Sequence, residues 1–350
     1  MMEDNKGVYY GDYLQLDKIL DAQFPESEKE NVEAHDEMLF IIVHQAYELW
    51  FKQILHELGS VTNIMGEPTI NDNSPQMQMV VHRLERVVEI LKLLVQQVNV
   101  IETMTPLDFL DFRDLLRPAS GFQSFQFKII EATLGLKLEH RYGKDFYLTH
   151  LRKNDIEKVA KIEKQRSVIE LVNEWLERMP YFDDSHFWDE YKAGGKRIGQ
   201  IHVFWEDFRN IYTKSLVEGE KENLKRFDQL FFNPEFTANR RLSNKANRSA
   251  LFIMLYRDYP ILQLPYRLLN LLLEIDEQMA TWRYRHMNMV HRMIGTRVGT
   301  GGSSGKDYLK AALDRHYIFK EIAELTSFLI ERRKLPSLPQ KLERKFRFEH

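Results

Sequence analysis

The spacing of apolar residues along the chain predicts a helical protein. From Met77 to Val98 apolar side chains recur every three or four positions, which is the spacing of one face of an α-helix. Ser74 and Pro75 stand directly before this run and suit an N-cap and a first-turn proline. The run 37–58 is apolar on most faces, so we expect a central, buried helix there.

Two further runs follow the same pattern. One extends from Ile156 to Leu176, and the other begins near Pro265 and ends at Gly295. No internal repeat and no convincing strand alternation accompanies them. We therefore predict an all-α fold.

The organisation expected from these runs is one domain over residues 1–350. Most of the chain would form a large, bundle-like helical body. The stretch of about 195–250 is more polar and in places basic, and we expect it to form a smaller helical lobe.

Composition narrows the chemistry. The 350 residues carry a net charge of −3, which gives no indication of a nucleic acid or an acidic membrane as partner. The chain has no cysteine, so disulfides, zinc–thiolate sites, iron–sulfur clusters and a thiolate-ligated haem are excluded. No apolar run approaches the ~20 residues that span a bilayer, and the opening residues lack the apolar core of a signal peptide. We expect a cytoplasmic protein without a membrane partner.

A glycine-rich stretch follows the last long helical run. Five of the chain's sixteen glycines lie between Gly295 and Gly305. A phosphate-binding loop needs Gly-x-x-x-x-Gly-Lys-Ser/Thr, but Thr300 occupies the first glycine position and Asp307 replaces the hydroxyl residue. A nucleotide-binding enzyme is therefore disfavoured, and a helical interaction protein would leave the glycines unexplained.

Single histidines in apolar surroundings are the main candidates for chemistry. His44 follows an apolar run, and His286 lies among tryptophan, methionine and valine. His291 is five residues from His286, about 140° around a helix at ~100° per residue, so one metal cannot take both. Each lone histidine is either a hydrogen-bonded core residue or a single axial ligand or polar group of a dry pocket, and the pattern alone does not decide.

Two other groups of residues admit both a binding and a structural interpretation. Arg113 shares a helical face with Phe109 and either clamps a carboxylate or lies exposed at the surface, with its aliphatic stem over the phenylalanines. Near the amino end, Tyr10 and Tyr13 belong to an aromatic segment that lies against its own core or docks on another subunit. Ser120 stands in a turn and offers a side-chain oxygen.

Five blocks of the sequence together resemble the tryptophan 2,3-dioxygenase family. The blocks, in family order, are "YGDYLQLDKIL", "HDEMLFIIVHQAYELWFKQILHEL", "LKLLVQQ", "ETMTPLDFLDFRDLLRPASGFQSFQF" and "WRYRHMNMVHRMIGTRVGTGGSSGKDYL". The resemblance implies a mostly helical homotetramer, a dimer of dimers, with one haem b per subunit that is active as Fe(II). It implies addition of both atoms of O₂ to L-tryptophan, which opens the indole pyrrole ring to N-formyl-L-kynurenine in the first step of the kynurenine pathway.

The same resemblance implies roles for individual residues. His286 matches the axial iron ligand, and His44 matches the distal histidine that orients the indole N–H. Arg113 matches the arginine that holds the substrate carboxylate, and Thr300 matches the threonine at the amino-acid end. Residues that line the substrate pocket are matched by Phe40, Phe109, Leu116 and Ser120. Tyrosines that reach into a neighbouring subunit's pocket are matched by Tyr10 and Tyr13.

The resemblance also suggests a role for the glycine-rich stretch. As a hypothesis, its glycines let residues 295–306 fold over the substrate as a lid that orders when tryptophan binds. The alternative is a permanently ordered loop that caps the preceding helix.

Overall fold

Helices make up nearly all of the regular structure. The computed structural model describes residues 7–68, 74–141, 148, 150–192, 197–198, 201–297 and 316–348. The strands in this part of the chain are two residues long and pair as one antiparallel hairpin, β1 (Arg197–Ile198) with β2 (Ile201–His202). The all-α prediction is confirmed.

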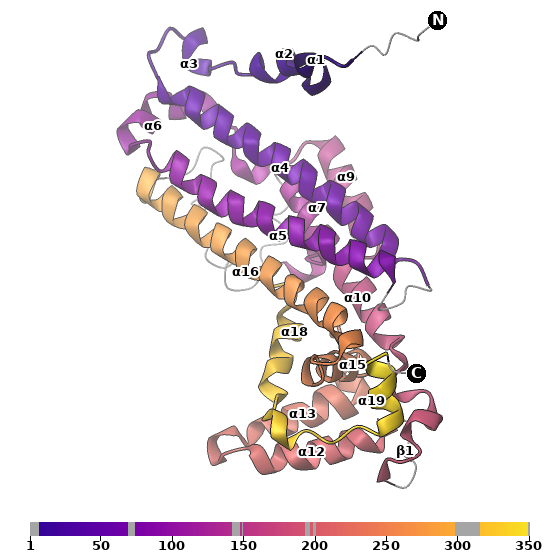
Figure 1. The fold of residues 1–350 in the computed structure, drawn as a ribbon. Coiled ribbons are helices and arrows are strands. Elements are labelled where there is room, and N and C mark those ends of the chain that lie inside the picture. Colours follow the sequence, from indigo (N-terminus) through magenta and orange to yellow (C-terminus); the bar gives the residue numbers. More distant parts are fainter. Residues whose placement is uncertain are drawn as a thin grey trace, which may run out of the picture.

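Three long helices form the frame of the molecule. They are α4 (Asp36–Met65), α5 (Pro75–Ile101) and α16 (Pro260–Ile294), and they run side by side with α5 in contact with both others (Figure 1). A fourth helix, α7 (Phe125–Leu134), packs on α4. Apolar side chains of this frame, such as Ile54 and Leu84, are almost completely buried. The frame is therefore held together by burial of apolar surface.

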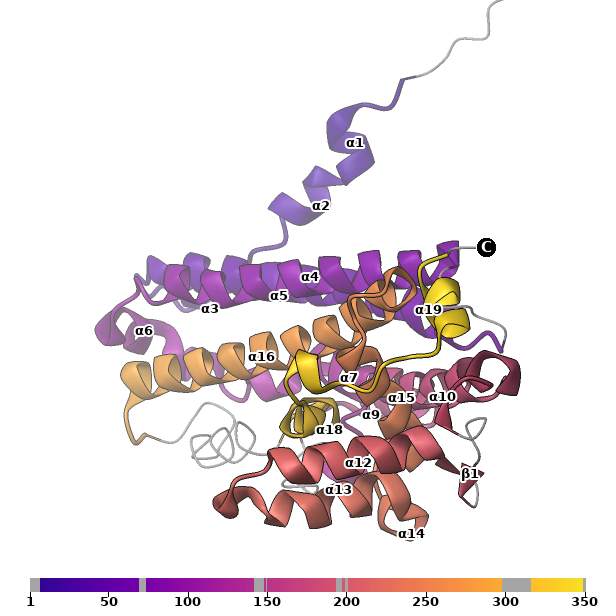
Figure 2. The same ribbon diagram turned by 60° about the horizontal axis from the view of Figure 1, so that its bottom comes forward.

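A second group of helices gathers around the first half of α16. It includes α12 (Val203–Ser215), α13 (Glu222–Phe232) and α15 (Asn244–Leu255) (Figures 1 and 2). Aromatic side chains fill its interior, and they are continuous with the apolar core of the long helices. The other α-helices are short: α1 (Tyr10–Leu14), α2 (Leu16–Leu20), α3 (Glu26–Lys29), α6 (Pro106–Arg113), α9 (Lys153–Glu163), α10 (Val168–Glu177), α14 (Pro234–Thr237), α18 (Lys320–Glu324) and α19 (Gln340–Phe346).

Single turns of 3₁₀ helix connect several of these elements. They are η1 (Asp114–Leu116), η2 (Gly121–Gln123), η3 (Leu138–His140), η4 (Pro180–Phe182), η5 (Ser185–Trp188), η6 (Glu218–Glu220), η7 (Leu325–Phe328) and η8 (Arg332–Lys334).

Two predicted helix boundaries are confirmed. The Ser74 side chain caps α5 by accepting the Met77 N–H at 3.2 Å, and Pro75 is the first residue of the helix. Helix α16 ends at Ile294, and Gly295 follows with φ +60°, a conformation that favours glycine.

Two other predictions were wrong in part. The single helix expected over 156–176 is two helices, α9 and α10, because Ser167 and Glu170 form a capping box that starts a new helix. The helix expected to begin near Pro265 begins at Pro260, so Pro265 lies inside α16.

Helix α4 is less buried than its sequence predicts. Its inner face is buried at positions such as Ile54 and Leu58, but Ile42 is 49% exposed and Leu49 is 54% exposed. An apolar stripe therefore remains uncovered on the outer side of α4 within the described part of this chain. In the same part of the chain, no helix is both long enough and apolar enough to cross a membrane.

Candidate active site

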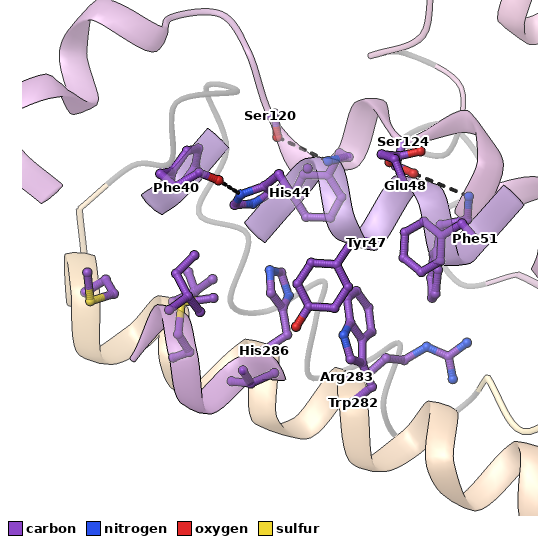
Figure 3. Close-up of a pocket in the computed structure, with 18 of the residues that line it drawn as sticks. Phe40, His44, Tyr47, Glu48, Phe51, Ser120, Ser124, Trp282, Arg283 and His286 are labelled. Atoms are coloured by element: carbon purple, nitrogen blue, oxygen red, sulfur yellow. Dashed lines mark hydrogen bonds between the residues drawn. The ribbon is translucent and has the colours of Figure 1, made fainter. Parts of the chain in front are cut away.

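A cavity lies between the frame helices. It is located near the first half of α4 and the last turns of α16, next to α6. Its volume is about 310 Å³, which is at the lower end of the range of small-molecule sites. Most of its wall is apolar, and side chains from α4, α5, α6, α7 and α16 contribute to it. Figure 3 shows residues of α4 and α16 reaching into this space from facing helices. The structure thus brings together segments more than 200 residues apart in sequence.

His44 lies on α4 at this cavity with a defined tautomer. Its Nδ1 is 2.7 Å from the carbonyl oxygen of Phe40. Because a carbonyl only accepts, we assign the hydrogen to Nδ1, which leaves Nε2 with a free lone pair. Burial lowers the pKa of His44, although the Phe40 hydrogen bond and the charge of Glu48 act in the opposite direction. His44 is therefore a neutral hydrogen-bond acceptor at neutral pH.

Aromatic rings and one buried guanidinium form the wall next to His44. The Phe40 ring lies 4.1 Å from the His44 ring and 5.7 Å from the ring of Phe109, both measured between centroids. Helix α6 begins with a capping box at Thr105 and ends at Arg113, so Phe109 and Arg113 lie one turn apart, as predicted. Arg113 is only 4% exposed and borders the cavity. The interpretation as a solvent-exposed arginine is excluded.

The turn after α6 contributes Ser120 but not Leu116 to the cavity wall. Ser120 borders the cavity, and its Oγ accepts the N–H of Phe122 at 3.3 Å. Leu116 packs instead against a small apolar cluster that contains Met104, Phe112 and Met293. Leu116 thus lies behind the wall that Met104 and Met293 form.

His286 borders the cavity from α16. Burial lowers its pKa to about 4, and the nearby His44 contributes to this shift. Its ring lies flat against the ring of Trp282, with centroids 5.2 Å apart and an interplanar angle of 1°. His291, in contrast, is exposed. The two histidines of α16 therefore face different surroundings, as their spacing predicts.

A buried charged cluster borders the same cavity, and the sequence analysis did not find it. Glu131 of α7 pairs with Arg141 and with Arg283, each at 2.6 Å. These two arginines hold the pKa of Glu131 below its usual value, although burial alone would raise it. Lys128, one turn before Glu131, is 8% exposed, and burial lowers its pKa to about 8. Two charged residues at helical spacing in the apolar run "FQFKIIEATL" were the signal available in the sequence.

The remaining predicted site residues lie elsewhere. Tyr10 and Tyr13 are 71% and 75% exposed. They belong to α1, which projects from the body of the chain (Figure 2). Thr300 and most of the predicted lid 295–306 lie outside the described residues.

The donor set of the cavity restricts how a metal can bind. The described part of the chain has no group of three or more His, Asp or Glu side chains that suits a metal ion. His286 presents one neutral imidazole, and among the described residues neither of its nitrogens has a hydrogen-bond partner. A single protein ligand suits a metal whose other positions are filled by a macrocycle.

Comparisons with known proteins agree on one family. The sequence profile described as tryptophan 2,3-dioxygenase matches residues 1–329. The tryptophan 2,3-dioxygenase of Bdellovibrio bacteriovorus is 45% identical over 98% of this chain and 99% of its own length. Those of Dictyostelium discoideum and Mus musculus are each 42% identical, over 98% and 95% of this chain and 89% and 84% of their own lengths. The chain belongs to the tryptophan 2,3-dioxygenase family, whose members are dioxygenases of tryptophan breakdown.

Proposed function

We propose that this protein inserts both atoms of O₂ into L-tryptophan at a haem in the cavity and releases N-formyl-L-kynurenine, the first product of the kynurenine pathway. The observation that carries the proposal is a pair of neutral imidazoles, His44 and His286, that approach one apolar cavity from facing helices beside the buried Arg113. Such a site can hold a cofactor on one side and an amphipathic amino acid on the other.

The residues of the cavity fit haem b. His286 would hold the iron, because its low pKa keeps the imidazole unprotonated at neutral pH. Lys128, Arg141 and Arg283 border the cavity around Glu131, and cationic side chains of this kind suit the carboxylates of a porphyrin. Ferrous haem supplies the activation of O₂, and the protein supplies position and a dry environment.

Arg113 would bind the carboxylate of tryptophan. A guanidinium presents two parallel donors that match two carboxylate oxygens. At 4% exposure, this pairing is little screened by water. We propose that Arg113 fixes the amino-acid end and that Thr300 assists it at the ammonium or carboxylate group.

The indole ring would pack against Phe40 and Phe109, with Ser120 in the surrounding wall and Leu116 behind that wall. His44 Nε2 would accept the indole N–H, since Nδ1 is already engaged by the Phe40 carbonyl. In this role His44 orients the substrate and does not need to remove its proton. Exclusion of water by the aromatic walls strengthens each of these polar contacts.

Assembly would complete the site. Segment 7–24 carries exposed apolar side chains, including Tyr9 and Phe24, on an arm that projects from the chain. Such an arm gains stability by packing on another subunit. We propose a cytoplasmic homotetramer, a dimer of dimers, in which the single-domain subunits exchange these arms and Tyr10 and Tyr13 reach a neighbour's substrate. The stretch 295–306 would close over the bound substrate.

Isotope labelling tests the proposed reaction. The haem-loaded, reduced protein is supplied with L-tryptophan and isotopically labelled O₂, and the product is analysed by mass spectrometry. We expect N-formyl-L-kynurenine that carries two labelled oxygen atoms. A hydroxylated tryptophan with one labelled atom, or no turnover by fully haem-loaded protein, contradicts the proposal.

A further inference from the structure

We propose that Trp282 is a positioning residue for His286: its flat stack on the imidazole sets the plane of that ring and thereby the direction of the nitrogen that holds the iron. This inference rests on the proposed function, because it takes His286 as the residue that would hold the haem iron. It adds a residue to the site that neither the spacing of the histidines nor the family resemblance identified.

The His286 ring needs an external constraint. The torsion that rotates an imidazole about its attachment to the Cβ atom has a broad energy minimum, so the plane of the ring is defined by what surrounds it. In metalloproteins this constraint is usually a hydrogen bond from the ring nitrogen that does not bind the metal. Among the described residues no such hydrogen bond to His286 is present. His44 differs, because the carbonyl of Phe40 fixes its Nδ1 at 2.7 Å.

The stack on Trp282 supplies that constraint. Trp282 and His286 are one helical turn apart on α16, and the planes of their rings differ by 1° at a centroid separation of 5.2 Å. Rotation of the imidazole would push its edge into the indole face. The contact therefore restricts the one torsion that a hydrogen bond would otherwise control.

The indole is itself held in place from three sides. Its ring contacts Phe127 of α7 at 4.9 Å, Tyr47 of α4 at 6.0 Å and Phe51 of α4 at 6.4 Å between centroids. Tyr47 is fixed in turn, because its hydroxyl donates to the carbonyl of Leu94 on α5 at 3.0 Å. Figure 3 shows Tyr47 and Phe51 reaching from α4 toward Trp282. The orientation of His286 is thus tied to the packing of four helices.

The test is the iron–histidine vibration of the ferrous, haem-loaded protein, measured by resonance Raman spectroscopy. Trp282→Leu removes the flat face and should broaden, split or shift the band, because the ring then adopts several orientations. Transfer of haem to an excess of apomyoglobin should become roughly 2- to 12-fold faster, the equivalent of losing one aromatic pair. Trp282→Phe retains a flat ring and should keep a band close to that of wild type.

The matched control is Phe127→Leu. It removes an aromatic ring from the same cluster, but Phe127 has no ring contact with His286 in the structure. Because Phe127 packs on Trp282 but not on His286, we expect a smaller change of its band than in Trp282→Leu. If Trp282→Leu does not fold, Trp282→Met has a longer, more flexible side chain that adapts to the vacated space without a flat face, and it gives the same comparison.

The outcomes separate this inference from the proposed function. A Trp282→Leu band identical in position and width to that of wild type overturns the positioning role and leaves His286 as the ligand. An equal change in Phe127→Leu also overturns it, because general packing would then explain the effect. Absence of any iron–imidazole band in the wild type contradicts the proposed function instead.

Discussion

Replacement of Arg113 by methionine should weaken tryptophan binding strongly without removing the cofactor. The substitution keeps an aliphatic stem of similar length and deletes the guanidinium, which is 4% exposed in the native protein. Loss of one member of a buried charged pair costs about 2–5 kcal/mol, because the other charge is then left without a partner. This corresponds to a roughly 30- to 5,000-fold rise in the KM for tryptophan.

The assay is steady-state formation of product by haem-loaded protein, with L-tryptophan and with tryptamine, which lacks the carboxylate. The loss in kcat/KM caused by Arg113→Met should be large for tryptophan and small for tryptamine. Arg117→Met is the control, because Arg117 is one turn further on, its side chain is 53% exposed and its ion pair among the described residues is with the exposed Asp114. An equal loss for both substrates, or an equal effect of Arg117→Met, refutes the assignment.

Four further predictions concern His44, the buried charges and the glycine-rich loop. His44→Ala should retain haem but lower kcat about 100-fold through misplacement of the indole, and a wild-type rate refutes this. Because burial lowers the pKa of His44, the wild-type kcat/KM should stay level as the pH falls to 6.5, the usual histidine value, and an acid limb above it contradicts the assignment. Glu131→Gln should lower the free energy of unfolding, measured in urea at pH 7, by roughly 3–5 kcal/mol, because Arg141 and Arg283 lose their anion. Since the pKa of Glu131 is depressed in the folded protein, the difference between variant and wild type should shrink as the pH falls below the usual carboxyl pKa. An unchanged midpoint of urea unfolding at pH 7 contradicts the prediction. Tryptophan should slow proteolysis within 296–306, and equal cleavage rates with and without it count against a lid.

Local signals in the sequence predicted helix ends well where one residue decides the geometry. Ser74 and Pro75 fix the start of α5 through contacts within one turn, so the prediction needed nothing distant. The break between α9 and α10 was missed because the apolar spacing continues across it in phase. There the capping box of Ser167 and Glu170 outweighs the periodicity.

The sequence was less informative where the outcome depends on distant or external contacts. The ion pair between Glu131 and Arg283 joins residues 152 positions apart, and no local pattern indicates their meeting. The exposed Ile42 and Leu49 on α4 show another limit. Apolar character predicts that a face is covered, but not whether the covering residues belong to the same chain.

The candidate site was likewise predictable where local spacing decides the geometry, and not where distant segments meet. The helical spacing of Phe109 and Arg113 predicted their common face, and the spacing of His286 and His291 predicted that the two point in different directions, so that one metal cannot take both. Neither pattern indicated that His44 and His286 share a cavity, because α4 and α16 are brought together by packing on α5. That pairing entered only through the family resemblance.

The most direct test of the central claim compares haem binding in two single variants of α16. His286→Ala removes the imidazole that borders the cavity, and His291→Ala removes the exposed one five residues later. After reconstitution with haemin, the account predicts an intense Soret band with the spectrum of imidazole-ligated iron in wild type and His291→Ala, and loss of stable haem from His286→Ala. Haem bound equally well by His286→Ala and wild type would contradict it.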